Sequence, residues 1–168
     1  MNKFLLIILS LFLIISCQKK DKETIKKKKI SSKKNNTITI EKFSYTESNK
    51  GKVKWILISN KAVIDNHKKI IDLDKVKIIY KKYIIHSKKG KYFLDKKIAE
   101  LYDSVKIFDN KTSFSTNKLK FYSLQNKIET DNGINVFNEN FKLYAKKMVG
   151  YIDKNKFILK GGVKSIIK

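Results

Sequence analysis

Four segments of this chain align at a fixed spacing of 29 residues. With Val76, Val105, Ile134 and Val163 as anchors, the positions six, twelve and twenty residues before each anchor and three after it are apolar in all four copies. A period between 20 and 50 residues is typical of stacked supersecondary units, none of which buries its own apolar face alone. The chain is therefore predicted to be built from about four repeated units.

The residues between the anchors favour β-strands. They are rich in Ile, Val, Phe, Tyr and Thr, and the chain has no proline. Short runs such as Val76–Ile78 alternate apolar and polar residues, which indicates one dry and one wet face. Each unit is expected to hold about two strands and two turns, although Tyr92 to Tyr102 has some helical periodicity and is an alternative site for a short helix. Turn signals occur at 87–90, 109–111, 131–133, 153–155 and 161–162.

The amino terminus carries a short apolar run behind a basic residue. Lys3 precedes Phe4–Ile15, twelve residues interrupted only by Ser10. A membrane-spanning helix needs about 20 apolar residues, so residues 1–16 are predicted to be a secretory signal peptide. The run ends in Ile-Ile-Ser-Cys, which resembles the lipobox of bacterial lipoproteins. That resemblance implies that Cys17 is lipidated and holds the chain to a membrane, and the alternative is an uncleaved anchor.

Residues 17–36 are expected to be a flexible tether. After Cys17, they contain nine Lys, two acidic residues and only two apolar residues, Ile25 and Ile30. Such a segment offers too little burial to offset its ordering entropy. Residues 37–168 then form the folded domain, which has no cysteine and therefore no disulfide.

The net charge of +24 does not indicate nucleic-acid binding. Every basic side chain apart from two histidines is Lys, and the chain has no Arg, the residue that contacts bases bidentately. The abundance of Lys, Ile and Asn is expected from an AT-rich genome. The charge can instead attract an anionic substrate or membrane.

No catalytic or metal-binding constellation is visible. His67 and His86 stand 19 residues apart without a metal-ligand or phosphate-binding motif. The pair Asp72 and Asp74 is more typical of a solvated strand edge than of a glycosidase site. We therefore expect no enzyme activity, no cofactor and no metal, and a hydrolase is the weakest alternative.

Several segments together resemble the LptC family, the periplasmic, inner-membrane-associated components of the lipopolysaccharide export bridge. The resemblance rests on Ile70–Ile78, on Ile128–Val136 and on Lys118–Tyr122, behind an amino-terminal anchor and a polar tether. It covers residues 38 to 168. The family's members are often held by a transmembrane helix, whereas this chain has a lipobox.

A second departure concerns the glycine that precedes the anchor valine in the family pattern. It is kept as Gly133 and Gly162 but replaced by Lys75 and Ser104 in the first two copies. The departures leave open whether the chain is the base of the bridge or an LptA-like bridge protein.

The resemblance implies an all-β fold, a twisted open β-jelly-roll of antiparallel strands whose two sheets form a V with an apolar interior. Lipopolysaccharide acyl chains would lie in this groove, because exposing each methylene to water costs about 0.8 kcal/mol. A closed β-sandwich of a structural or adhesive surface lipoprotein would need the same apolar residues for its core. The groove candidates are the repeat positions Ile56, Ile64, Ile70, Val76, Ile85, Phe93, Val105, Phe114, Tyr122, Ile128, Ile134, Leu143, Tyr151 and Phe157.

The same resemblance implies partners at the two ends of the roll, where unpaired edge strands can add to like-folded proteins. Residues near Ile38, Ile40 and Phe43 are expected to meet the periplasmic domain of an inner-membrane ABC transporter. The expected partner edge for a like-folded bridge protein comprises Val163, Ser165, Ile166 and Ile167.

Overall fold

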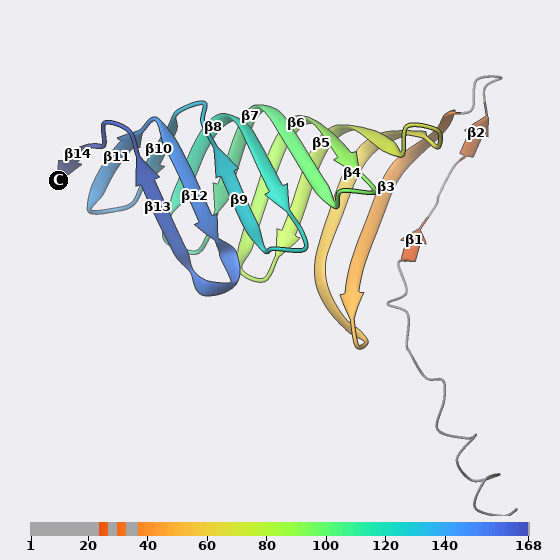
Figure 1. The fold of residues 1–168 in the computed structure, drawn as a ribbon, viewed down its shortest axis with the longest axis horizontal. Helices are drawn as coiled ribbons and strands as arrows, with labels where there is room; N and C mark the ends of the chain where they lie inside the picture. The colour runs from red at the N-terminus through yellow and green to blue at the C-terminus, as the bar shows by residue number, and fades with distance from the viewer. Residues whose placement is uncertain (1–23, 27–29, 33–36, 168) are drawn as a thin grey trace, which may run out of the picture.

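The computed structural model describes residues 24–26, 30–32 and 37–167, and this part of the chain forms one large antiparallel sheet rolled onto itself (Figure 1). Within these described ranges, the only helical element is a single 3-10 turn, Ile152–Lys154. The predicted all-β, antiparallel class is confirmed. The strands are β1 Thr24–Lys26, β2 Ile30–Ser32, β3 Thr37–Asn49, β4 Lys52–Asp65, β5 Ile70–Tyr80, β6 Tyr83–Phe93, β7 Ile98–Phe108, β8 Ser113–Tyr122, β9 Lys127–Thr130, β10 Ile134–Phe137, β11 Phe141–Ala145, β12 Lys147–Tyr151, β13 Lys156–Lys160 and β14 Lys164–Ile167.

The long strands β3 to β8 pair in sequence order, and the sheet then forks at β8. Residues 113–115 of β8 pair with β10, whereas residues 120–122 pair with β9. One branch continues through β9, β12 and β13, and the other through β10, β11 and β14. We call the half-strands that lead to β13 the first leaf and those that lead to β14 the second leaf. In Figure 1 the two branches lie one in front of the other.

The 29-residue repeat appears as a pair of strands per unit. The units begin at Ile70, Ile98, Lys127 and Lys156, and the residue before each has a positive φ of 50 to 53°. In the last two units the long strands are split into β9 and β10, β11 and β12, and β13 and β14. The prediction of about two strands and two turns per unit is therefore confirmed for the long strands, which break into shorter ones toward the carboxyl terminus.

The residue before each repeat anchor marks the kink where a strand passes from the first leaf to the second. Lys75, Ser104, Gly133 and Gly162 have φ values of 52°, 58°, 71° and 70°. This left-handed conformation costs an ordinary L-residue roughly 1–2 kcal/mol and glycine little. The first two copies thus adopt the conformation that the glycines favour, although neither has a glycine.

In most of the long strands the kink also changes the parity of the residues that face the interior. In β5, Ile71 and Leu73 are buried before the kink, and Val76, Ile78 and Tyr80 are buried after it. The same switch occurs in β4, β6 and β8. Alternation by two therefore holds only within each half-strand.

Buried hydroxyls satisfy backbone carbonyls at the kinks of β4, β6 and β8. The Oγ atoms of Ser59 and Ser87 lie 2.6 and 2.9 Å from the carbonyl oxygens two residues later, and Thr116 Oγ1 lies 3.3 Å from its equivalent. Buried polar groups need such partners. Ser59, Ser87 and Thr116 are 28 and 29 positions apart, so a hydroxyl-bearing residue at this kink recurs with the 29-residue repeat.

The turn predicted at 87–90 is wrong, because these residues form the kink inside β6. Ser87 bonds within the strand, and Gly90 lets the next strand approach closely, since a Cβ there would lie 3.0 Å from Leu101 Cδ2. The turns predicted at 109–111, 131–133, 153–155 and 161–162 are confirmed as breaks between strands. The alternative helix at Tyr92–Tyr102 is not formed, because this segment is the end of β6, a turn and the start of β7.

Strands β1 and β2 lie in the segment that composition predicts to be a flexible tether, and both pair with β3. The proposed signal peptide and Cys17 lie outside the described residues. Within the described ranges, no helix is long and apolar enough to cross a membrane.

Candidate functional site

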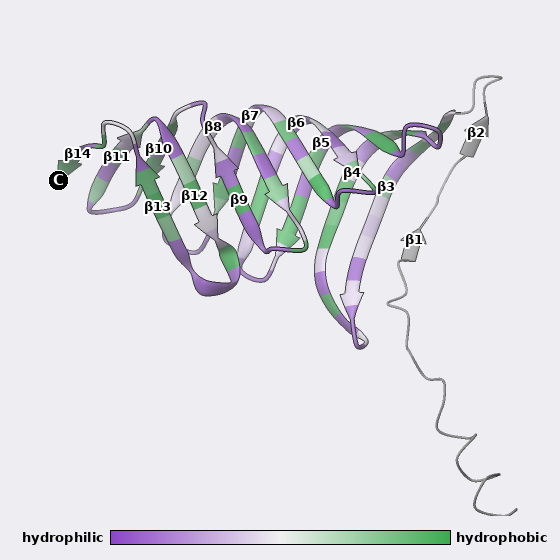
Figure 2. Ribbon diagram, viewed as in Figure 1, coloured by the Kyte–Doolittle hydropathy of each residue, from purple (hydrophilic) through white to green (hydrophobic). Residues whose placement is uncertain are grey.

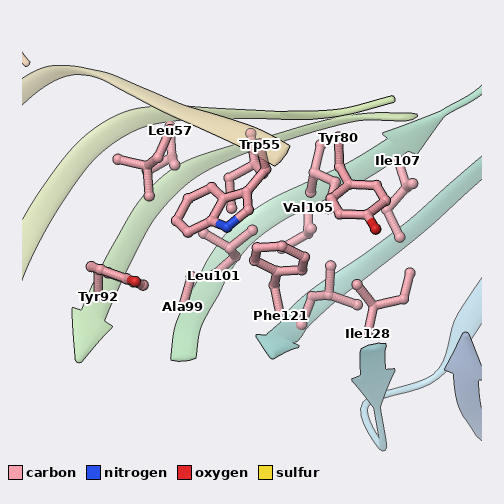
Figure 3. Packing of buried hydrophobic residues seen from close by; sticks show 14 of the residues in the cluster. Trp55, Leu57, Tyr80, Tyr92, Ala99, Leu101, Val105, Ile107, Phe121 and Ile128 are labelled. Carbon is pink, nitrogen blue, oxygen red and sulfur yellow. The ribbon is translucent and has the colours of Figure 1, made fainter. Parts of the chain in front are cut away.

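The interior of the roll is a continuous apolar layer contributed by both leaves (Figure 3). An aromatic cluster joins the leaves: Trp55 and Tyr80 come from the second leaf, and Tyr92 and Phe121 from the first. The ring centroid of Trp55 lies 5.4 Å from that of Phe121 and 5.8 Å from that of Tyr92, in edge-on contacts. Tyr80 meets Phe121 at 6.3 Å. Edge-on aromatic pairs of this kind contribute about 0.5–1.5 kcal/mol beyond their burial.

The hydropathy pattern follows these leaves along the whole roll. Figure 2 shows apolar and polar residues alternating along the strands from β3 to β13. Apolar residues from successive half-strands thus line one unbroken interior, as shown by the buried cluster that runs from Ile40 to Ile152.

The structure brings nine of the fourteen predicted groove residues to this interior. Seven are at most 7% exposed, and two are partly buried against the same core. They are Ile64, Val76, Ile85, Val105, Phe114, Ile128 and Ile134, with Leu143 and Phe157 as the partly buried pair.

The other five predicted groove residues lie on the outer face of the sheet. Each is half-buried and adjoins a fully buried residue in its strand, as Tyr122 adjoins Phe121. Successive residues of a strand face opposite sides, so these five do not line the interior. The prediction placed all repeat columns on one face of the sheet. The kink changes the parity of the inward-facing positions, so some columns face inward and others outward. The five are Ile56, Ile70, Phe93, Tyr122 and Tyr151.

Many interior residues were absent from the repeat columns. Fully buried examples are Phe43, Tyr45, Trp55, Tyr92 and Phe121. Apolar alternation could have identified them if it had been counted separately on each side of the kink. In β6, for example, the buried positions before the kink are odd-numbered (Tyr83, Ile85 and Ser87), and those after it are even-numbered (Gly90 and Tyr92).

On the outer face, Tyr122 takes part in a polar cluster. Its hydroxyl donates a hydrogen bond to Glu129, and Lys127 Nζ lies 4.0 Å from its ring centroid and 3.0 Å from Glu129 Oε2. Burial and then the Glu129 carboxylate raise the pKa of Tyr122 to about 12. Burial alone would raise the pKa of Glu129, but hydrogen bonds from Tyr122 and Lys127 outweigh it and lower that pKa.

Contacts between the strand ends close the interior on one side. Lys54 of the second leaf donates to the carbonyl of Ser123 in the first leaf at 3.2 Å and lies 3.6 Å from Glu47. Ser123 Oγ lies 3.1 Å from the Lys97 carbonyl, and Lys97 Nζ lies 3.5 Å from the Tyr45 hydroxyl. These contacts hold the two leaves together near β3 and β4.

A second set of contacts closes the roll nearer its carboxyl-terminal end. The Tyr83 hydroxyl of the second leaf donates to Asn155 of the first leaf. The Phe157 ring lies 4.8 Å from that of Phe114 and 5.8 Å from that of Tyr83. Side-chain contacts between the leaves thus close the interior at this end as well.

The carboxyl-terminal end of the roll presents two strand edges. Among the described strands, β14 pairs only with β11 and β13 pairs only with β12. Ile166 and Ile167 are 66% and 80% exposed. Of the predicted edge residues, Ser165, Ile166 and Ile167 lie in β14, and Val163 lies just before it.

The amino-terminal end is different, because the edge of β3 is paired. Ile38 and Ile40 lie opposite residues of β2, and Phe43 is fully buried at the kink. This edge, expected to meet the transporter, is therefore occupied in the structure.

The titratable residues considered as catalytic candidates are dispersed. His67 lies exposed in a turn where its amide donates to Asp65. His86 lies on the outer face, where partial desolvation by neighbouring side chains and then the charge of Lys77 lower its pKa. Asp72 and Asp74 pair with Lys91 and Lys89 at 3.2 and 2.8 Å. Among the described residues, no group of three or more His, Cys, Asp or Glu could hold a metal ion.

A cavity of about 340 Å³ lies where the second half of β8 meets β9 and β12. Its lining combines four lysines with two carboxylates and an apolar floor that includes Met148. The charged lining residues are Lys118, Lys120, Lys147, Lys160, Glu129 and Asp131.

Comparison with known proteins agrees with this geometry. The family described as "Lipopolysaccharide-assembly, LptC-related" matches residues 4–168. The crystal structure of LptH from Pseudomonas aeruginosa, described as the LptA homologous periplasmic component of the conserved lipopolysaccharide transport device, has a similar fold with a TM-score of 0.57. The two chains are 10% identical, and the match covers 68% of this chain and 94% of that chain. No curated protein matches the chain.

Proposed function

Because the chain belongs to the LptC-related family of lipopolysaccharide-assembly proteins and is a periplasmic component of lipopolysaccharide transport, we propose that it holds lipopolysaccharide acyl chains between its two leaves. The observation that carries the proposal is the unbroken apolar interior shared by both leaves. Exposing an acyl chain of about twelve methylenes to water would cost about 10 kcal/mol of free energy. An interior of this kind shields the chains while sugars and phosphates remain in water.

Loading requires the leaves to separate at the strand ends. The polar contacts there are weak: Lys54 and Glu47 form a partly exposed ion pair, and such pairs contribute at most about 1 kcal/mol. The aromatic contacts between leaves are apolar on both sides, so an acyl chain can replace them with contacts of the same kind. Opening therefore exchanges one apolar packing for another.

The two ends of the roll support partners of like fold. The exposed β14 edge fits β-augmentation by a periplasmic bridge protein. The periplasmic domain of an inner-membrane ABC transporter would meet the β3 end, where it would have to replace the pairing of β1 and β2 with β3. Cargo would pass from the transporter toward the outer membrane. A place as the LptA-like bridge protein is the alternative.

We further propose that residues 1–16 are a signal peptide, that Cys17 is lipidated, and that the lipid holds the chain to the periplasmic side of the inner membrane. The support is the sequence Ile-Ile-Ser-Cys after a short apolar run. We assign no catalytic role, cofactor, metal or nucleic-acid partner. The dispersed histidines and the absence of Arg support this assignment.

A photocrosslinking amino acid placed in cells tests the interior. At Phe114, which is buried between the leaves, it should capture lipopolysaccharide, whereas at Lys106 on the outer face it should not. Capture at Lys106 alone would contradict the proposal. If neither position captures lipopolysaccharide, and the cell envelope stays intact when the protein is depleted, a surface lipoprotein with a closed β-sandwich would be favoured.

A further inference from the structure

Exposed apolar side chains gather at the carboxyl-terminal end of the second leaf. Six of the nine large apolar side chains that are exposed in the described part of the chain belong to β7, β10, β11, β14 or the segment just before β14. Soluble domains rarely expose large contiguous apolar patches, and such patches mark sites of interaction. The six are Phe108, Phe137, Tyr144, Val163, Ile166 and Ile167.

The strand register arranges the outer face at this end in two rows. Strands β7, β8, β10, β11 and β14 pair in this order, and directly opposed residues of an antiparallel pair share a face. The rows adjoin buried residues such as Ile107 and Val136, which places them on the outer face. The first row is Phe108, Ser113, Phe137, Lys142 and Ile166, and the second is Lys106, Ser115, Asn135, Tyr144 and Lys164.

We call these ten residues the outer patch. With about 4.8 Å between neighbouring strands, each of its rows is about 19 Å long. One row is mainly apolar and the other mainly polar or cationic. The outer patch is therefore amphipathic across its width.

The outer patch holds three lysines and no carboxylate. The outer face of the first leaf is different, because four carboxylates lie there and each is within 3.5 Å of a lysine Nζ. The two outer faces thus differ in charge balance, and only that of the second leaf combines exposed aromatic residues with unopposed positive charge. The four carboxylates are Asp72, Asp74, Glu100 and Glu129.

The turns beside the outer patch change this charge little. They contain Asp109, Lys111 and Glu139. Asp109 accepts hydrogen bonds from the amides of its own turn and lies 3.6 Å from Lys82 Nζ, so its charge is already engaged. The end of the second leaf therefore remains positive overall.

We propose that the outer patch binds an anionic phospholipid surface. Phe108, Phe137 and Ile166 enter the boundary between headgroups and acyl chains, and the lysines meet the lipid phosphates. Binding of this kind depends on buried apolar area together with attraction to anionic lipids. Each lysine near such a surface strengthens binding about fivefold.

Charge complementarity selects this occupant. A second copy of the chain would bring the same positive patch and be repelled. A protein partner would have to present carboxylates beside an apolar stripe, whereas an anionic lipid surface offers both negative charge and apolar depth at every point.

This inference goes beyond the proposed binding of lipopolysaccharide acyl chains, because it uses the outer face and not the interior. Vesicles without lipopolysaccharide can therefore test it. In cells, a photocrosslinker at Lys106 should capture phospholipid, while one at Phe114 reports on lipopolysaccharide in the interior. Failure of one proposal leaves the readout of the other unchanged.

An amino acid whose fluorescence responds to polarity tests contact with lipid. It replaces Phe137 in the full-length chain, and in a matched control it replaces Phe93 on the outer face of the first leaf. The chain is mixed with phosphatidylcholine vesicles that contain one third phosphatidylglycerol or none. Emission should shift to shorter wavelength only at position 137 and only with the anionic vesicles. Equal shifts at both positions, an equal shift without phosphatidylglycerol, or no shift would overturn the proposal.

Charge reversal tests the role of the lysines. The triple variant Lys106→Glu, Lys142→Glu and Lys164→Glu should reduce the emission change at position 137 at least about tenfold, because three attractions become repulsions. The matched control makes the same change of net charge on the outer face of the first leaf, with Lys118→Glu, Lys147→Glu and Lys160→Glu.

The control variant should keep most of the emission change. Equal reduction in both variants would show that only net charge matters and would overturn the proposal. An emission change that appears on addition of a like-folded protein and never with vesicles would assign the outer patch to a protein and would overturn it as well.

Discussion

Replacing Phe121 and Tyr122 separately with alanine tests how the kink divides inner from outer positions. The two residues are neighbours in β8, of similar size, and differ in the face they occupy. Phe121 is fully buried and contacts Trp55 and Tyr80 across the leaves. Tyr122 is half-buried and bonds to Glu129 on the outer face.

The expected losses of unfolding free energy are clearly larger for Phe121→Ala than for Tyr122→Ala. Truncating a buried phenylalanine costs about 3–5 kcal/mol. For Tyr122, loss of one hydrogen bond and of part of the ring's burial amounts to about 1–2 kcal/mol. At a urea slope of about 2 kcal/mol per M, the midpoint should fall by about 2 M for Phe121→Ala and by less than about 1 M for Tyr122→Ala.

Urea unfolding followed by tryptophan fluorescence measures both values. Trp55 is the only tryptophan and is 1% exposed, so its emission reports the loss of contact between the leaves. Tyr122→Phe is a control that keeps the ring and removes only the hydroxyl. A loss for Tyr122→Ala as large as that for Phe121→Ala would refute the assignment of faces.

Four further predictions concern the kinks, the interior, the outer cluster and the lipid at Cys17. Gly133→Ala should lower the free energy of unfolding by about 1 kcal/mol, because φ is 71° at this residue, whereas Lys75→Gly should not lower it. The urea midpoints of the two variants check this prediction, and equal losses of stability would contradict it. Gly150→Ala should cost about 1–3 kcal/mol, because its Cβ would lie 2.8 Å from Ile128 and Phe157, and an unchanged melting temperature would show that the site has space. Tyr122 should ionise near pH 12 in an ultraviolet titration, and the stability it contributes should be complete below pH 10 and lost as pH rises from 10 to about 12; a titration that Tyr122→Phe leaves unchanged would count against this. Radioactive palmitate should label the unmodified chain and not Cys17→Ala, and labelling of both would contradict lipidation of Cys17.

The repeat was sufficient to predict the class of fold because period and alternation are local properties. The spacing of Val76, Val105, Ile134 and Val163 reflects one conserved kink geometry, with a left-handed residue before each anchor. Turn residues at Asp109 and Asp131 marked true strand ends. Such features depend on neighbouring residues and survive in any arrangement of the strands.

The assignment of faces was not predictable from the columns alone. Ile56 and Tyr122 repeat as regularly as Val76 does, but the kink changes the parity between their half-strands. Residues 87–90 have the composition of a turn, yet the Ser87 hydroxyl donates a hydrogen bond to the Lys89 carbonyl within the strand. These features depend on how the two leaves meet, which the one-dimensional pattern does not contain.

The segment before Thr37 shows the same limit. Its composition predicts a tether, because two isoleucines among nine lysines offer little burial. The structure nevertheless pairs Thr24–Lys26 and Ile30–Ser32 with β3, because a strand edge offers backbone hydrogen bonds that composition does not record.

The most direct test of acyl-chain binding uses Trp55 as a reporter inside the roll. Lipopolysaccharide with bromine on its acyl chains should quench Trp55 emission of the purified chain in a saturable way, because the chains would lie between the leaves beside Trp55 and Phe121. Lipopolysaccharide brominated only on its sugars should quench much less. Equal quenching by both, or none by the acyl-labelled form under conditions where binding is complete, would contradict the account.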